Sequence, residues 1–95
     1  MELRISDIVE SLNGRDEGGL FFIVSMKEEY AFLADGRRRR IEKPKLKKIK
    51  HLRYAGRSEN RAAEKLRSGE KVTNNELRRA LAEYAAAQSG GMEVC

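Results

Sequence analysis

Residues 7–34 read DIVESLNGRDEGGLFFIVSMKEEYAFLA and contain three short apolar stretches separated by turn-forming residues. β-Branched and aromatic residues dominate these stretches, as they do in strands. A glycine-rich loop and the polar turn at Lys27-Glu28-Glu29 would connect them. The pattern predicts strands over residues 7–12, 19–26 and 30–35.

Two further strands are expected after Asp35-Gly36, a dipeptide that strongly favours a hairpin turn. The fourth would cover residues 37–42 and end before Pro44, because proline removes a donor from the ladder. The fifth would cover residues 47–53. Five short strands at this spacing fit a small, partly open β-barrel.

The sequence changes character after residue 57, so we expect a β domain over residues 1–57 and a helical tail over residues 58–95. Ser58 is a candidate N-cap for a short first helix over residues 59–67, and Gly69 would end that helix.

A second helix over residues 74–87 is specified more strongly. Thr73 and Glu76 have the spacing of a capping box, and Val72 can pack on Leu77 as a hydrophobic staple. One helical face then collects Leu77, Ala80, Leu81, Tyr84 and Ala85. Ser89-Gly90-Gly91 is expected to end the helix, and the last residues are expected to be disordered.

The length of 95 residues suits one domain with a small core. No apolar run approaches the roughly 18 residues that span a membrane, and the amino terminus lacks an apolar signal core. Cys95 is the single cysteine, which excludes an internal disulfide. These features predict a cytoplasmic protein, which we expect to be a monomer.

Positive charge is concentrated between Arg37 and Arg57, where eleven bases accompany one acid, Glu42, to give +10. The rest of the chain carries −5, so the whole chain carries +5. A block of one sign is typical of a segment that binds a polyanion, most often nucleic acid. The alternative is a merely solvated surface, which would normally mix both signs as the rest of this chain does.

Four consecutive arginines, Arg37 to Arg40, fit a regular strand poorly, because alternation would aim two of them at the core. We therefore expect the hairpin around Asp35-Gly36 to project, with only Ile41 and one arginine stem packed. Projecting guanidinium groups can bond to phosphates in pairs and stack on bases. The alternative is that these charges only keep a sheet edge from pairing with another chain.

The segment SDIVESLNGRDEGGLFFIV, residues 6–24, resembles the KOW motif, a strand–loop–strand signature of ribosomal and transcription-elongation proteins. The continuation ADGRRRRIEKPKLKKIKHL, residues 34–52, resembles the large-subunit ribosomal protein fourteen family of eukaryotes and archaea. The ending LRSGEKVTNNELRRALAEY, residues 66–84, resembles that of KOW-domain RNA-binding proteins of Gram-positive bacteria. Ser6 departs from the motif, which usually has a glycine before the first strand.

The resemblance implies an SH3-like β-barrel whose KOW loop contacts RNA, with ribosomal RNA of the large subunit as the expected partner. In this loop we expect Gly14 to adopt a positive φ, and Gly18 and Gly19 to leave backbone amides open to a phosphate or ribose. Arg15 would be the charged contact at the tip, and Asp16 would hold the loop or orient Arg15. The alternative is a structural turn without a ligand, since glycine-rich loops are common turns.

The predicted RNA-binding residues therefore come from the loop and from the basic segment 37–57. They are Asn13, Gly14, Arg15, Asp16, Gly18, Arg37, Arg38, Arg39, Arg40, Lys43, Lys45, Lys47, Lys48, Lys50, His51 and Arg53.

An enzyme is not expected, because His51 is the single histidine and no metal-ligand or phosphate-loop spacing occurs. We accordingly expect no cofactor and no metal. The competing hypothesis is a protein-binding adaptor of the KOW type, acting in transcription elongation or ribosome assembly with ribosomal proteins among its partners. Its contact surface would be the stripe of Leu77, Leu81 and Tyr84, unless this stripe packs on the protein's own sheet. Pro44 and the lack of an apolar aromatic face argue against a membrane-surface role.

Overall fold

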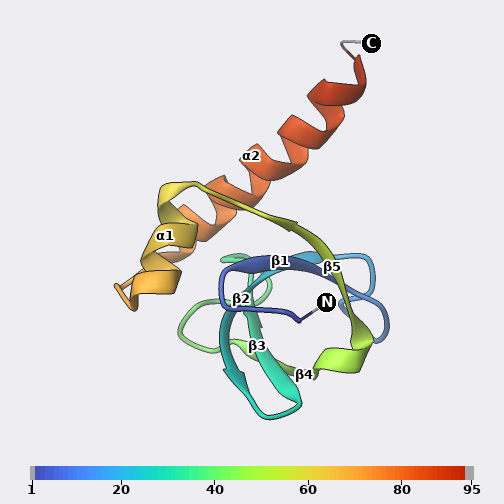
Figure 1. The fold of residues 1–95 in the computed structure, drawn as a ribbon, viewed down its shortest axis with the longest axis vertical. Coiled ribbons are helices and arrows are strands. Elements are labelled where there is room, and N and C mark those ends of the chain that lie inside the picture. Colours follow the sequence, from blue (N-terminus) through green and yellow to red (C-terminus); the bar gives the residue numbers. More distant parts are fainter. Residues whose placement is uncertain (1, 94–95) are drawn as a thin grey trace.

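The computed structural model describes residues 2–93, and the side chains of residues 2–87 (Figure 1). No helix in this part of the chain combines the length and the apolar character needed to cross a membrane. The elements are β1 (Asp7–Ser11), β2 (Leu20–Lys27), β3 (Tyr30–Ala34), β4 (Lys45–Lys48), the 3-10 turn η1 (Ile49–His51), β5 (Leu52–Arg57), α1 (Arg61–Ser68) and α2 (Asn74–Glu93).

The five strands form one antiparallel sheet in the order β4-β3-β2-β1-β5. A mainly β fold followed by two helices is therefore confirmed. The predicted barrel is not closed, because β4 and β5 are the two edges of the sheet and do not pair with each other in the described residues. Only η1 separates these two strands along the chain, so the sheet must coil strongly to bring its edges near each other.

The predicted strand over residues 37–42 is wrong. Asp35 Oδ1 accepts hydrogen bonds from the backbone N–H groups of Arg37 and Arg39, both at 2.9 Å. The N–H groups of Asp35 and Gly36 donate to the Arg39 carbonyl at 2.9 and 3.1 Å. A short polar side chain thus takes amides that a strand would give to its neighbour. Residues 35–40 form a compact turn instead, and β4 begins only after Pro44.

The predicted fifth strand over residues 47–53 is also wrong as a single element, because β4, η1 and β5 divide it. The N–H of Ile49 donates to the Glu29 carbonyl at 2.8 Å, and the His51 carbonyl accepts from the N–H of Leu12 at 3.0 Å. These two bonds tie η1 to the β2–β3 turn and to the end of β1. They therefore hold the chain where it passes from one edge of the sheet to the other.

Both faces of the sheet are buried along its centre. The inner face of the coiled sheet collects Val9, Phe21, Ile23, Ala31, Leu33 and Leu52. The outer face contributes Ile8, Phe22 and Ala34, which pack with Ala62, Ala63, Val72, Leu77, Ala80 and Leu81 of the tail. Burial on two faces explains why β2 reads as a continuous apolar run instead of alternating.

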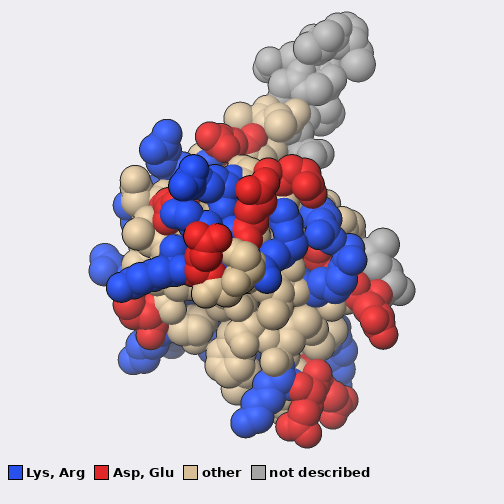
Figure 2. Space-filling view, turned by 60° about the vertical axis from the view of Figure 1, so that its left-hand side comes forward, with Lys and Arg blue, Asp and Glu red and all other residues tan. Residues whose placement is uncertain are grey.

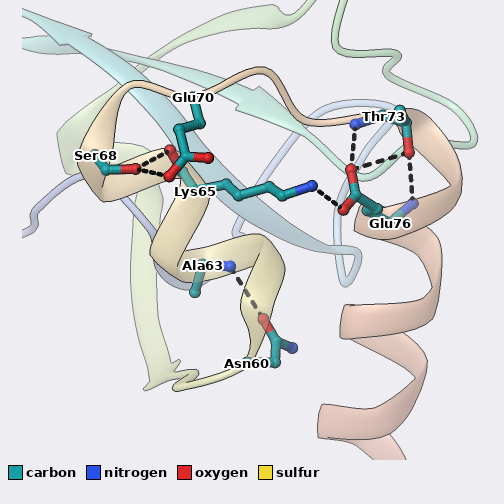
Figure 3. Close-up of polar contacts among 7 residues, drawn as sticks. All are labelled: Asn60, Ala63, Lys65, Ser68, Glu70, Thr73 and Glu76. Carbon is teal, nitrogen blue, oxygen red and sulfur yellow. Dashed lines mark hydrogen bonds and ion pairs between the residues drawn. The ribbon is translucent and has the colours of Figure 1, made fainter.

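The first helix begins at a different residue from the one predicted. Asn60, not Ser58, is the N-cap of α1, and its Oδ1 accepts from the N–H of Ala63 at 3.0 Å (Figure 3). Ser58 lies just before it, where its Oγ accepts from the N–H of Asn60 at 3.2 Å. Gly69 ends α1 at a left-handed φ of 80°, as predicted.

The capping box that begins α2 is confirmed (Figure 3). The N–H of Thr73 donates to Glu76 Oε1 at 2.9 Å, and the N–H of Glu76 donates to Thr73 Oγ1 at 3.2 Å. Lys65 of α1 adds a bond from Nζ to Glu76 Oε2 at 2.6 Å. Val72 and Leu77 are buried in one cluster, as the staple predicts. This junction fixes the angle between the helices.

The predicted end of the second helix at residue 87 is wrong, because α2 continues to Glu93. A glycine costs a helix about 1 kcal/mol relative to alanine, yet it keeps its N–H, so Gly90-Gly91 weakens the helix without ending it. The expected disorder of the last residues concerns residues 94 and 95, which lie outside the described part of the chain.

The chain enters β1 through an unusual backbone conformation. Ser6 is buried and has a φ of +77°, in the left-handed region that favours glycine. Its N–H donates to the Ile23 carbonyl at 2.8 Å, and its Oγ accepts from Arg67 Nη1 at 3.0 Å. These contacts hold Ser6 in this conformation, which residues other than glycine rarely adopt.

Candidate nucleic-acid interface

Two segments that are distant in sequence lie side by side at the predicted site. One is the glycine loop, residues 12–19 between β1 and β2, and the other is the arginine turn, residues 35–44 between β3 and β4. Asp16 in the loop accepts from Arg39 in the turn, with Nε at 3.3 Å and Nη2 at 2.9 Å from Oδ2. Asp16 is 4% exposed. This partly buried ion pair therefore joins the glycine loop to the arginine turn.

A second contact holds the glycine loop from the side of β4. Lys47 Nζ donates to the Asn13 carbonyl at 2.7 Å. Gly14 has a φ of +78°, which confirms the predicted positive φ, and a Cβ at this position would lie 3.5 Å from Lys47 Nζ. Lys47 thus belongs to the framework of the loop as well as to the basic segment.

The prediction that Gly18 and Gly19 leave their amides uncovered is wrong. The Gly18 N–H donates to the Ser11 carbonyl at 2.8 Å, and the Gly19 N–H donates to the Asp16 carbonyl at 2.9 Å. The loop uses these donors to close on itself, as a glycine-rich turn does. The space beside Gly18 is nevertheless open, with no atom within 4 Å of a Cβ built there. Arg15 is exposed.

The arginine turn surrounds a cationic hollow of about 500 Å³. Arg37, Arg38 and Arg40 are exposed, whereas Arg39 is half-buried by its contact with Asp16. Ile41 packs against the hydrophobic cluster between the outer face of the sheet and the helical tail. One packed arginine and a packed Ile41 were expected of this segment, although it is a turn and not a hairpin of strands. The residues around the hollow are Arg37, Arg38, Arg39, Arg40, Lys43, Pro44, Lys45 and Leu46.

The remaining predicted residues lie away from this hollow. Lys48 and Lys50 line a different depression beside the acids Glu28 and Glu29. Arg53 on β5 pairs with Glu10 on β1. His51 is half-buried in η1. Hydrogen bonds therefore join the glycine loop to Arg39 and Lys47, and residues 48–53 do not line the hollow.

Two side chains of α2 that no sequence pattern pointed to hold the arginine turn on the tail. Asn74 Oδ1 accepts from the N–H of Ile41 at 2.7 Å, and Arg78 Nη1 donates to the Gly36 carbonyl at 2.7 Å. Gly36 has a φ of +79° and lies so close to Asn74 that a Cβ would overlap the Asn74 backbone. The first two turns of α2 thus support the arginine turn.

The carboxylate of Glu42, which contacts Asn74, has a lowered pKa. Asn74 Nδ2 donates to both carboxylate oxygens of Glu42, at 2.9 and 3.1 Å. This amide contact, helped by the backbone of Glu42 and by the charges of Arg40 and Lys71, lowers the pKa of Glu42. Glu42 is therefore ionised at neutral pH, and it is the single acid of the basic segment.

The apolar stripe of α2 packs on the protein's own sheet. Leu77 and Leu81 are buried against the outer face, and Tyr84 Oη donates to the Ala55 carbonyl of β5 at 2.7 Å. Gly56 permits this approach, because a Cβ there would overlap the Tyr84 ring and hydroxyl. This stripe is therefore not free to serve as the contact surface of an adaptor. Among the described residues, no group of three or more His, Cys, Asp or Glu side chains could hold a metal ion.

No protein-family model matches this chain, and a comparison with curated proteins finds no significant match.

Proposed function

We propose that this protein is a non-catalytic RNA-binding protein with a KOW-type, SH3-like barrel, which binds ribosomal RNA of the large subunit in the cytoplasm as a monomer. The observation that carries the proposal is the Asp16–Arg39 ion pair, which holds the glycine loop against the hollow of the arginine turn. The strong coiling of the five-stranded sheet fits such a barrel. The KOW resemblance supports ribosomal RNA as the particular partner.

The geometry suits the recognition of a folded or single-stranded RNA backbone. Arg37, Arg38 and Arg40 are exposed around the hollow, where their planar guanidinium groups can bond to phosphate oxygens in pairs. Arg39 and Lys47 are already fixed by bonds within the protein. Because the loop and the turn are held in place before RNA arrives, less ordering opposes binding.

A protein-binding adaptor remains the alternative, but the apolar stripe of α2 that would be its contact surface is buried against the sheet. Affinity in an adaptor is carried by buried apolar and aromatic anchors and depends weakly on salt. Leu77 and Leu81, which were candidates for such anchors, are buried in the protein's own core. A charged surface around an open hollow fits a polyanion better.

The dependence of RNA affinity on salt tests the proposal. About five phosphate contacts predict that log K falls with log salt at a slope of about −4, since each contact contributes about −0.7 to −0.9. Arg38→Ala and Arg40→Ala should each flatten the slope by nearly one unit and weaken binding to all RNAs alike. Arg15→Ala should instead reduce discrimination among RNAs, if the loop reads shape or an exposed base.

Arg61→Ala is the matched control, because it removes one exposed base of α1 outside the basic segment and should leave the slope unchanged. Heparin and duplex DNA are needed as competitors at physiological salt. Equal binding of RNA and both competitors would contradict the proposal and favour the adaptor. Sedimentation of the protein with large ribosomal subunits would test the ribosomal part separately.

A further inference from the structure

The outer face of the sheet is covered by the helices at one end only. Phe22, Val24 and Ala34 pack with the helical tail, whereas Tyr30, Phe32 and Leu46 belong to neither hydrophobic cluster. Figure 1 shows the β2–β3 hairpin extending away from both helices. Among the residues whose side chains are described, none of either helix covers this part of β2, β3 and β4.

The strand register shows which side chains share this uncovered face. Ser25 pairs with Phe32, and Phe32 pairs with Leu46. In the next row, Lys27 pairs with Tyr30, and Tyr30 pairs with Lys48. Residues that pair directly point to the same side of a sheet, and Tyr30, Phe32 and Ala34 alternate onto one face of β3. Two aromatic rings thus lie one after the other, with a lysine on either side of Tyr30.

This face is open to solvent. Leu46 is 47% exposed, Lys27 and Lys48 are exposed, and the two aromatic side chains are half-buried. Figure 2 shows uncharged surface above the charged tip of the hairpin, below a belt of charged side chains. Half-buried rings in such a place are supported from below by the sheet and still present ring surface to a ligand.

We propose that Tyr30 and Phe32 stack two bases of single-stranded RNA, while Lys27 and Lys48 contact the adjoining phosphates. This inference rests on the proposed RNA-binding function and adds the class of RNA. Residues two apart on a strand are separated by about 7 Å, which is about twice the 3.4 Å between stacked bases. The rings would therefore hold bases that are not stacked on each other, as single strands allow and duplexes do not.

The surface is continuous with the proposed phosphate site. Leu46, which ends the Phe32 row, also lines the hollow of the arginine turn. At the other end, Glu28 and Glu29 are exposed in the β2–β3 turn and would repel a phosphate backbone. An RNA strand can thus run from the arginines over the aromatic rings, and the acids limit how far it continues.

Tyr30→Leu and Phe32→Leu test the inference, because leucine keeps the apolar contact with the sheet and removes the ring. Affinity would be measured at one salt concentration for an eight-nucleotide uridine strand and for an RNA hairpin duplex. Each variant should bind the single strand about tenfold more weakly and the duplex almost unchanged. Tyr54→Leu is the matched control, since Tyr54 is 38% exposed on β5 and outside this face.

Tyrosine fluorescence gives a second readout, because the chain contains no tryptophan and three tyrosines. The uridine strand should quench the wild type and Tyr54→Leu, and it should quench Tyr30→Leu less. If the leucine variants do not fold, photocrosslinking of a 4-thiouridine strand to the wild type decides the question. Crosslinks in β3 or β4 support stacking, and crosslinks confined to other elements overturn it.

Different experimental results would refute the stacking surface and the proposed RNA-binding function. Unchanged single-strand affinity in both leucine variants, with binding still weakened by Arg38→Ala, would overturn the stacking surface and leave RNA binding intact. A wild-type protein that does not prefer RNA to heparin would refute RNA recognition itself.

Discussion

Asp16 is an acid inside a proposed polyanion-binding site, and its burial against Arg39 explains how it can belong there. Asp16 is 4% exposed, and its Oδ2 lies 2.9 Å from Arg39 Nη2, so one guanidinium group largely neutralises the negative charge. If charge alone governed RNA affinity, removing this acid would strengthen binding. If the ion pair instead positions the loop and the turn, removing it would weaken binding.

Asp16→Asn should therefore weaken RNA binding, although it makes the protein more positive. The variant should also unfold about 1 to 2 kcal/mol more easily, because a charged hydrogen bond is lost and Arg39 is left poorly compensated. Equilibrium RNA titration and urea unfolding measure the two effects. Glu17→Gln is the control, since this exposed neighbour has the same charge, and its loss should leave RNA affinity equal or slightly higher. Stronger binding by Asp16→Asn would show that the ion pair does not position the site.

Positive φ angles at two residues other than glycine, Ser6 at 77° and Glu28 at 55°, predict different changes of stability on substitution by glycine. Glu28 is exposed in the β2–β3 turn, so Glu28→Gly should relieve backbone strain and stabilise the fold by about 0.5 to 1 kcal/mol. Ser6→Gly should gain less or lose stability, because it also removes the hydrogen bond from Arg67. Urea unfolding with unchanged m-values would measure both, and a destabilised Glu28→Gly protein would contradict the argument.

The junction of α1 and α2 depends on one ionised carboxylate, that of Glu76. The Lys65 ammonium group, followed by the Thr73 backbone, lowers the pKa of Glu76 to about 2 from an ordinary value of 4.5. A group with a lowered pKa in the folded state stabilises the fold above its unfolded pKa. That contribution is lost as the pH falls through the interval between the two values.

Thermal stability should accordingly fall as the pH is lowered from about 4.5 to about 2. Glu76→Gln should be less stable than the wild type at pH 7, and its stability should depend less on pH in that interval. Glu64→Gln, which changes an exposed glutamate of α1, should keep the pH dependence of the wild type. Thermal unfolding followed by circular dichroism at several pH values measures this. If the melting temperatures of the wild type and of Glu76→Gln fall equally with pH, Glu76 is not the cause of the pH dependence.

Elements whose signals are local could be predicted from the sequence. The apolar stretches of β1, β2 and β3, the capping box at Thr73 and the end of α1 at Gly69 all depend on residues within a few positions of each other. The prediction of a strand over residues 37–42 was wrong. The Asp35 side chain accepts hydrogen bonds from the N–H groups of Arg37 and Arg39, and these bonds compete with the hairpin that Asp35-Gly36 favours.

The residues of the candidate site could be predicted from the sequence, but their arrangement in space could not. The basic segment was evident from its charge, yet the contact between Asp16 and Arg39 joins residues 23 positions apart. The support of the arginine turn by Asn74 and Arg78 spans still longer separations, which no local pattern encodes. The uncovered face of Tyr30 and Phe32 depends on where the tail stops covering the sheet, which only the packed structure shows.

The packing of the tail on the sheet also sets the order in which the protein can become complete during translation. Phe22 belongs to the outer face of the sheet, and Leu77 that covers it is synthesised 55 residues later. Until the second helix leaves the ribosome exit tunnel, the strands carry an unshielded apolar face, a surface on which nascent chains associate wrongly. The arginine turn also lacks Asn74 and Arg78 in that interval, so the emerging chain exposes its hydrophobic face before the arginine turn is supported.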